Sequence, residues 1–233
     1  MSDAPPEDAR ARVRRLAQQA LDGGDVTSWF ERAYVEAAGD ATGVPWADLT
    51  PNAAFAEWAA RPGVLSGVRT AAVVGCGLGH NAEFLAIRGV RVTAFDISET
   101  AIAWARRLHP ASSVKYEVAD LFAIPAGWKG TFDLVVEVYT IQALPRSIRG
   151  PATAAITSLL APGGRLFVTT RVRDDGPEAP PFDERSGGPP WPLGRGELFG
   201  LFATLTPVER PVETVDPADS TIIRSHGVWR RTK

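Results

Sequence analysis

The chain has 233 residues, with 25 Lys plus Arg against 27 Asp plus Glu, so its formal net charge is -2. This length fits a single α/β domain with at most a small appendage, and the near-neutral balance argues against a general nucleic-acid binder, which carries a basic excess. The single cysteine excludes an intramolecular disulfide framework and a multi-cysteine metal cluster, so no metal site is expected. A polar start and the lack of a long apolar run predict a cytoplasmic protein without a membrane partner.

The N-terminal segment, residues 1–65, is predicted to form a helical cover that contributes to the functional site. Apolar side chains recur at helical spacing from Val13 to Leu21, which indicates an amphipathic helix ending near Gly23. Its basic side chains are interpreted as a solvated helix face, namely Arg10, Arg12, Arg14 and Arg15.

The second part of this segment is aromatic and then helical. Residues 29–34 contain a Trp, a Phe and a Tyr, and Trp46 follows. Thr50 next to Pro51 has the pattern of an N-cap followed by proline at the first helical position, which predicts a helix to Ala60.

From residue 69 onward, short apolar runs alternate with helical patterns, which predicts a parallel sheet with right-handed crossovers. The expected strands cover residues 70–74, 90–95, 114–118, 132–138, 164–170, 205–212 and 221–229. The expected helices cover residues 81–88, 98–108, 145–160 and 195–202. The predicted fold of residues 66–233 is a Rossmann-like α/β domain with a seven-stranded, mostly parallel sheet and a terminal antiparallel hairpin.

Residues 174–192 interrupt this alternation with six prolines and three glycines. Long connections without regular structure are commonly lids or binding loops. We therefore expect a Pro-rich lid loop here.

A glycine turn follows the first strand of the predicted sheet and precedes a helix, the geometry that holds a nucleotide at the carboxyl edge of a sheet. Gly75, Gly77 and Gly79 have the spacing of S-adenosylmethionine binders, whereas Gly77, Gly79 and Ala82 also satisfy the dinucleotide pattern. Asp96 ends the second strand, where a carboxylate accepts hydrogen bonds from ribose hydroxyls in either case, so it does not separate the two patterns.

Segments farther along the chain favour the S-adenosylmethionine spacing over the dinucleotide pattern. Asp120 and Leu121 follow the third strand, and Leu-Ala-Pro-Gly-Gly at 160–164 precedes the fifth. Together with the terminal hairpin, these segments resemble class I S-adenosylmethionine-dependent methyltransferases over roughly residues 69–229. Residues 29–34 with 45–46, 143–145 and 188–190 add a narrower resemblance to the thiopurine and thiol methyltransferase family.

The resemblance implies a binding site for S-adenosyl-L-methionine. In it Asp96 would bind the ribose hydroxyls, Asp120 the adenine, and Glu137 the methionine amine, while Trp29 would cover the cofactor. The full expected set is Trp29, Gly75, Cys76, Gly77, Gly79, Asp96, Ile97, Asp120, Leu121 and Glu137.

The implied activity is methyl transfer by in-line displacement to a small-molecule acceptor, with a thiol sulfur as the first expectation. Glu137, Tyr139 and Tyr34 are the candidate catalytic residues, with His80 and His226 as further candidates. Transfer to oxygen, nitrogen, a halide or a metalloid is the alternative, and a NAD-dependent oxidoreductase is a second class that only the dinucleotide spacing favours. The substrate pocket is expected to be built from residues 29–46, 139–144 and 174–192. These segments are aromatic and apolar with few fixed charges, which predicts a fairly hydrophobic acceptor. The expected assembly is a monomer or homodimer.

Overall fold

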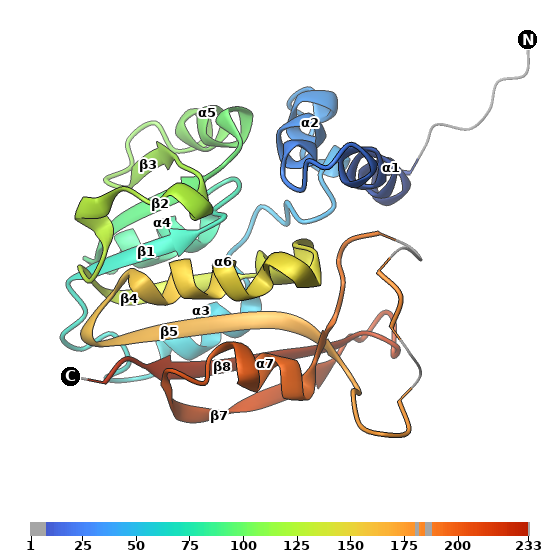
Figure 1. The fold of residues 1–233 in the computed structure, drawn as a ribbon. Coiled ribbons are helices and arrows are strands. Elements are labelled where there is room, and N and C mark those ends of the chain that lie inside the picture. Colours follow the sequence, from blue (N-terminus) through green and yellow to red (C-terminus); the bar gives the residue numbers. More distant parts are fainter. Residues whose placement is uncertain (1–7, 180–181, 185–187, 233) are drawn as a thin grey trace, which may run out of the picture.

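The computed structural model describes residues 8–179, 182–184 and 188–232, and within them one mixed sheet forms the centre of the molecule (Figure 1). The strand order is β3-β2-β1-β4-β5-β8-β7, with the short β6 paired to β5. The strands are β1 (Thr70–Val74), β2 (Arg91–Asp96), β3 (Lys115–Val118), β4 (Phe132–Val138), β5 (Leu160–Arg173), β6 (Leu193–Gly194), β7 (Thr206–Val215) and β8 (Ile223–Arg230).

The first five strands along the chain pair in parallel, whereas β8 pairs antiparallel with both β5 and β7. This arrangement confirms the predicted fold class, including the terminal hairpin. Strand β6 was not expected, because two residues are too short to produce an alternating pattern.

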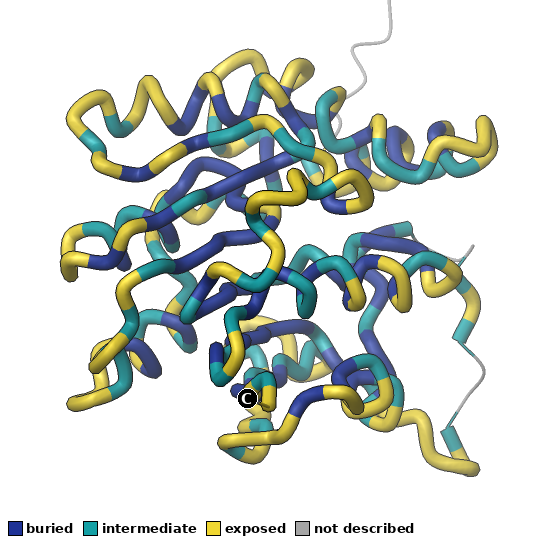
Figure 2. The backbone as a smooth tube through the Cα atoms, turned by 60° about the vertical axis from the view of Figure 1, so that its left-hand side comes forward, coloured by how far each residue is buried: buried dark blue, intermediate teal, exposed yellow. Residues whose placement is uncertain are grey.

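Helices cover both faces of the sheet, and the strands between them are the most buried part of the chain (Figure 2). In β1, Ala71 and Val73 pack with α3, α4 and α5, whereas Ala72 and Val74 pack with α6 and α7. The helices are α1 (Ala9–Asp22), α2 (Ser28–Ala37), α3 (Ala53–Ala60), α4 (His80–Ala86), α5 (Glu99–Leu108), α6 (Arg146–Ser158) and α7 (Arg195–Leu201).

Two helix starts show how well local capping was predicted. Ser98 caps α5 as expected, because its hydroxyl accepts a hydrogen bond from the Ala101 N–H at 2.9 Å. The expected cap at Thr50 is wrong, since Asn52 caps α3 through the Phe55 N–H at 3.1 Å. The Asn81 side chain accepts the N–H of Asn52 at 2.8 Å, which holds the chain extended up to this later cap.

Helices α1 and α2 lie together beyond the carboxyl ends of the parallel strands (Figure 1). Trp29 packs with Leu16 and Ala20 between them. Glu31 joins α2 to α5 by accepting hydrogen bonds from the Ser98 and Thr100 hydroxyls at 2.6 and 2.5 Å. None of the helices in the described ranges is long and apolar enough to span a bilayer.

The end of the predicted lid loop is held in place by backbone contacts. The Trp191 N–H donates to the Gln142 carbonyl at 2.7 Å, and the Arg149 guanidinium donates to the Trp191 carbonyl at 2.8 Å. The loop therefore returns to the sheet beside the carboxyl end of β4. Residues 180–181 and 185–187 of the predicted lid lie outside the described residues.

Candidate active site

A cavity of about 340 Å³ lies at the carboxyl ends of β1, β2 and β4. Its size is within the range of small-ligand pockets, and its place is where open α/β sheets bind ligands. Helices α1 and α2 and the loop residues Pro189 and Pro190 contribute the opposite wall.

The three glycines of the turn after β1 all line this cavity. Their φ values are 56° at Gly75, 52° at Gly77 and 90° at Gly79, where side chains are disfavoured. A Cβ atom at Gly79 would lie 2.2 Å from the Tyr116 hydroxyl, and one at Gly75 would lie 2.5 Å from the Thr140 hydroxyl. Glycine is thus required both by the backbone and by the packing behind the turn, which leaves the bare backbone facing the cavity.

Asp96 lines the cavity and also fixes the glycine turn. One carboxylate oxygen accepts the Gly77 N–H at 2.9 Å, and the other accepts the Ser98 N–H at 3.0 Å. Burial raises the pKa of Asp96, although these hydrogen bonds oppose the shift. Each carboxylate oxygen can accept a second hydrogen bond, so Asp96 retains the capacity to bind hydroxyl groups.

The predicted adenine contacts also reach the cavity wall. Ile97, Asp120 and Leu121 line it from the ends of β2 and β3. Asp120 is exposed, and one of its oxygens accepts the Phe122 N–H at 2.8 Å, which caps a short turn of 3-10 helix. Its other oxygen has no such backbone partner and is the acceptor available to an amino group.

Aromatic side chains from the N-terminal segment close the cavity. Trp29 is buried, lines the cavity, and its indole N–H lacks a partner among the described residues. The Trp46 indole donates to the Tyr34 hydroxyl at 2.8 Å. Cys76 lines the cavity beneath this cover, and burial raises the pKa of its thiol, so it stays protonated and has a packing role.

Glu137 does not line the cavity, which corrects its expected place beside the methionine amine. Its carboxylate is buried behind the turn after β4 and accepts the N–H groups of Thr140 and Ile141 at 2.6 and 3.0 Å. Burial raises the pKa of Glu137 to about 7, and its second oxygen has no hydrogen-bond partner in the described structure. The structure therefore gives Glu137 the role of holding this turn.

The two tyrosines expected near the reaction centre, Tyr34 and Tyr139, differ in whether they could act on a substrate. Tyr34 lines the cavity, but burial raises its pKa and its hydroxyl already accepts from Trp46, so it is unsuited to remove a proton. Tyr139 lines the opposite wall with φ at 63°, a conformation that side chains rarely adopt. Its N–H is held by the Thr169 carbonyl at 3.0 Å, so the backbone at Tyr139 is fixed in this orientation.

His80 lines the cavity at the start of α4. Burial and the nearby His109 lower the pKa of His80, which favours the neutral form of the ring. Phe30, Thr140, Gln142 and Leu144 also line the cavity. All four lie in the segments 29–46 and 139–144, which were expected to form the substrate pocket.

Four arginines also line the cavity, namely Arg10, Arg14, Arg171 and Arg224. This corrects the expectation of a pocket with few fixed charges. Arg10 and Arg14 are exposed, as expected for a solvated helix face, and they also line the cavity. Only the packing of α1 over the sheet brings their side of the helix to the pocket.

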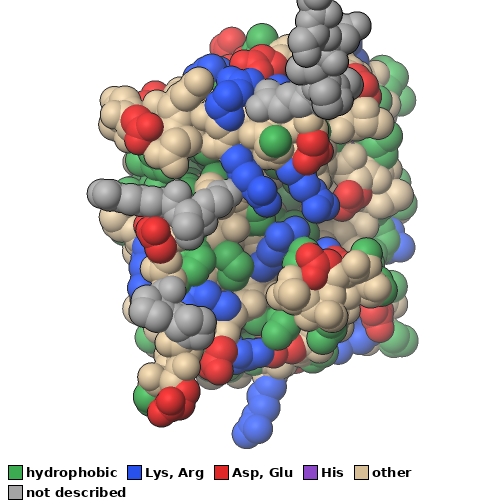
Figure 3. Space-filling view, turned by 90° about the vertical axis from the view of Figure 1, so that its right-hand side faces the viewer, with side chains coloured by type: hydrophobic (Ala, Val, Ile, Leu, Met, Phe, Trp, Pro, Cys, Tyr) green, Lys and Arg blue, Asp and Glu red, His purple; other side chains and the backbone are tan. Residues whose placement is uncertain are grey.

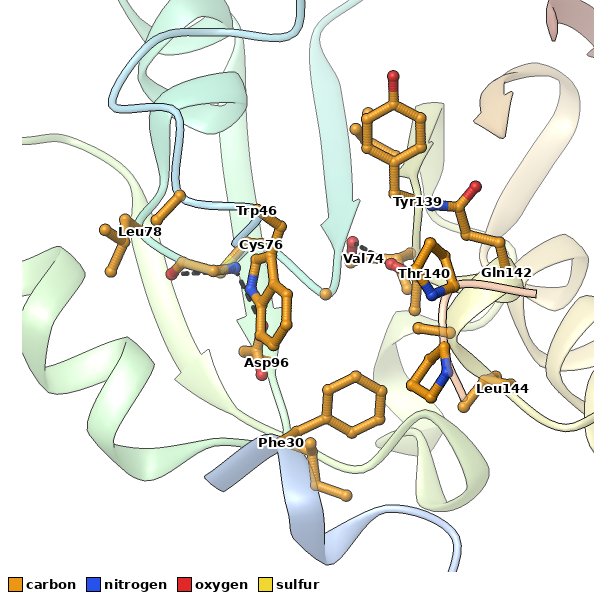
Figure 4. A pocket seen from close by; sticks show the side chains of 18 of the residues that line it. Phe30, Trp46, Val74, Cys76, Leu78, Asp96, Tyr139, Thr140, Gln142 and Leu144 are labelled. Atoms are coloured by element: carbon orange, nitrogen blue, oxygen red, sulfur yellow. Dashed lines mark hydrogen bonds between the residues drawn. The ribbon is translucent and has the colours of Figure 1, made fainter. Parts of the chain in front are cut away.

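The cavity has two sides, which Figure 4 shows on either side of Val74 at the end of β1. On the glycine-turn side lie residues 75–79, Asp96 and Asp120, with Cys76, Leu78 and Asp96 labelled in the figure. On the arginine side lie Tyr139, Gln142, Leu144 and the four arginines. Thr140 connects the sides, because its hydroxyl donates to the Val74 carbonyl at 3.3 Å.

Comparisons with known proteins agree with this geometry. Residues 72–164 match a family model described as a methyltransferase domain. A ubiquinone biosynthesis O-methyltransferase from Azotobacter vinelandii is 36% identical over 105 residues, which cover 43% of this chain and 44% of the relative. The matched stretch thus spans less than half the length of that curated relative.

Solved structures extend the likeness in fold to nearly the whole chain. The 1,6-didemethyltoxoflavin-N1-methyltransferase of Burkholderia thailandensis, solved with S-adenosylhomocysteine, has a TM-score of 0.61 and 20% identity, covering 100% of this chain and 94% of its own. The N-methyltransferase NodS of Bradyrhizobium japonicum, in complex with S-adenosylhomocysteine, has a TM-score of 0.59 and 20% identity, covering 97% and 100%.

The residues present fit the cofactor of such enzymes. The bare backbone of the glycine turn allows close approach, Asp96 keeps free acceptor capacity, and the unpartnered indole N–H of Trp29 can be satisfied by an acceptor on a ligand. Residues 72–164, which match the methyltransferase domain model, thus contribute the glycine turn, Asp96 and Asp120 to a pocket that fits S-adenosylmethionine.

Proposed function

We propose that the chain transfers a methyl group from S-adenosylmethionine to an oxygen atom of a small-molecule acceptor. The observation that carries this proposal is the two-sided cavity, in which the glycine turn and Asp96 face a second wall built around Tyr139. One side is suited to a nucleoside, and the other leaves room for a second molecule next to it.

The residues of the glycine-turn side hold the cofactor in this proposal. Asp96 accepts hydrogen bonds from the ribose hydroxyls, Asp120 accepts one from the adenine amine, and Trp29 covers the cofactor from α2. When bound, S-adenosylmethionine supplies a methyl group already activated by its sulfonium.

The chain's own contribution is then to position the acceptor and exclude water. Positioning of this kind can supply roughly 7–11 kcal/mol of the barrier. The aromatic cover of Trp29, Trp46 and Tyr34 keeps water from the reaction centre. Tyr139 is the candidate catalytic residue, placed to orient the acceptor hydroxyl, and His80 is the neutral group that can accept its proton.

Two observations favour oxygen over the sulfur expected from the sequence. The curated relative named above is an O-methyltransferase, and it matches this chain at 36% identity over the shared stretch. A hydroxyl also has more need of a base such as His80 than a thiol does, because a few per cent of a free thiol is already thiolate at pH 7. Thiol transfer remains the second candidate, on the resemblance of residues 29–34 and 45–46 to the thiol methyltransferases.

Two titrations and one assay test the proposal. Calorimetry is expected to show binding of S-adenosylhomocysteine and none of NAD. A labelled-methyl assay with catechol and thiophenol then compares oxygen with sulfur on the same ring, and catechol is expected to be the better acceptor. Binding of NAD in place of S-adenosylhomocysteine would refute the proposal, whereas preference for thiophenol would change only the acceptor atom.

A further inference from the structure

The arginine side of the cavity is built from segments far apart in the chain. Arg10 and Arg14 lie one turn apart on α1, Arg171 lies near the end of β5, and Arg224 lies near the start of β8. In Figure 3, basic side chains gather around the hollow on this face of the molecule.

These charges lie close enough to affect one another. Arg171 and Arg224 are register partners in the antiparallel β5–β8 pair, an arrangement that is unfavourable for like charges. Burial lowers the pKa of the half-buried Arg171, and the neighbouring cations Arg224 and Arg10 lower it further. Tyr139 and Asp216 oppose this effect.

Three of the four arginines lack an internal counterion. Among residues 8–179, 182–184 and 188–232, no side chain forms an ion pair with the guanidinium of Arg10, Arg14 or Arg171, and no hydrogen bond from these groups is found there. Arg224 alone has a carboxylate partner, Asp216. Asp48 also lines the cavity, from the loop before α3, without an ion pair to the cluster.

Some arginines elsewhere in the chain are engaged by other groups. Arg165 and Arg230 are also register partners on β5 and β8, but Arg165 donates to the Val64 carbonyl and lies over the Trp58 ring. Arg61 and Arg195 each form two hydrogen bonds to a glutamate. Exposed arginines such as Arg91 and Arg107 also have no ion pair among the described residues, so the distinguishing feature of the group at the pocket is that its members line one cavity.

We propose that the methyl acceptor is an aromatic molecule with an anionic oxygen group, a carboxylate or a phosphate, which Arg10, Arg14 and Arg171 bind. The guanidinium fork matches both groups, and bidentate pairing fixes orientation as well as affinity. The ring then lies against the apolar wall of Phe30, Trp46 and Leu144, with its hydroxyl toward the glycine-turn side. This inference rests on the proposed function and defines the substrate class of the same site.

The test uses acceptor probes that differ only in the anionic group. Catechol, 3,4-dihydroxybenzoate and 3,4-dihydroxyphenylphosphonate are titrated into the full chain saturated with S-adenosylhomocysteine, and methyl transfer to each is measured with S-adenosylmethionine. We expect one of the two anionic probes to bind about tenfold to a hundredfold more tightly than catechol. Which of the two is preferred distinguishes a carboxylate from a phosphate-type group.

An Arg171→Gln variant tests whether the tighter binding of the anionic probe depends on the arginines of the pocket. It is expected to bring the affinity for the preferred anionic probe close to that for catechol, while the affinity for S-adenosylhomocysteine is unchanged. Arg230→Gln removes an arginine from the same sheet outside the pocket and is expected to behave like the wild type. Because a misfolded variant would also lose S-adenosylhomocysteine binding, that affinity is the check on folding.

Three outcomes overturn the inference. They are equal binding of catechol and the anionic probes, absence of binding by both anionic probes, and an anion preference that survives in Arg171→Gln. Failure of S-adenosylhomocysteine to bind the wild-type chain would instead refute the proposed function. Normal cofactor binding without anion preference would refute this inference alone.

Discussion

The glycine-turn side of the pocket comes mostly from consecutive strand ends within residues 75–121, whereas the arginine side is assembled from α1, the turn after β4, and strands β5 and β8. The first side is made of backbone and acids already held by backbone N–H groups. The second presents Arg10, Arg14 and Arg171, for which the described residues supply no counterion. In the proposed function, the first side is a fixed site for the cofactor, and the second is a site that a charged acceptor completes.

Removing Arg149 is expected to have the largest effect, because this buried side chain holds the frame of the arginine side. Its guanidinium donates to the carbonyls of Leu144 and Trp191 and to Glu197. Arg149→Met leaves these acceptors unsatisfied and should lower the free energy of unfolding by about 3–5 kcal/mol in urea denaturation.

Arg195→Met is the matched control, since Arg195 pairs with Glu213 at the exposed surface. Its cost should be at most about 1 kcal/mol. Equal losses in the two variants would show that burial of Arg149 does not matter.

Gly79→Ala tests the glycine-turn side directly. The alanine would have φ near 90° and a Cβ atom 2.2 Å from the Tyr116 hydroxyl. Strain and overpacking together should cost about 2–5 kcal/mol of stability and abolish detectable S-adenosylhomocysteine binding in calorimetry.

Gly89→Ala separates strain from packing. Gly89 has φ at 83° but no atom within 4 Å of a built Cβ. It should lose only the strain contribution, about 1–2 kcal/mol, and keep full cofactor affinity. A cofactor defect in this variant would contradict the explanation.

Glu137→Gln tests the turn that joins the two sides. Burial raises the pKa of Glu137 to about 7 from a usual value of 4.5, so ionisation is disfavoured in the folded chain. Its contribution to stability is therefore fully present below pH 4.5 and is lost as the pH rises to about 7, in total about 3 kcal/mol.

Glutamine cannot ionise and can still accept the Thr140 and Ile141 N–H groups, so the variant should lack this decline. Urea unfolding of both proteins at pH 4.5, 6 and 8 measures the difference. If the two proteins lose the same stability between pH 4.5 and 8, Glu137 is not the group responsible.

Asp96→Asn is expected to have the smallest effect of the four. Loss of the charge weakens its hydrogen bonds to cofactor hydroxyls and should reduce the affinity for S-adenosylhomocysteine about tenfold to a hundredfold. Asp40→Asn is the control, because Asp40 likewise accepts a backbone N–H, from Thr42 at 2.9 Å, but lies outside the pocket. An unchanged affinity in Asp96→Asn would remove Asp96 from the binding site.

Most of the fold and of the glycine-turn side could be predicted from the sequence, because their signals are local. The order of short apolar runs identified the parallel sheet, and Gly75, Gly77 and Gly79 marked the turn after its first strand. Asp96 and Asp120 follow strands directly, so their place at the carboxyl edge follows from strand direction alone.

The four arginines of the arginine side were decided by tertiary structure, because no motif marks them. Tyr139, Gln142 and Leu144 lie in the segment 139–144, which was expected to form the substrate pocket. Arg14 looks like Arg15 in the sequence, yet Arg14 lines the pocket and Arg15 pairs with Glu36. Arg171 and Arg224 meet only through the pairing of β5 with β8. Glu137 ends a strand as Asp96 does, but its carboxylate turns behind the pocket because the turn after β4 supplies two N–H donors there. Periodicity and motifs determine which elements form, whereas the direction a side chain faces depends on how those elements pack against one another.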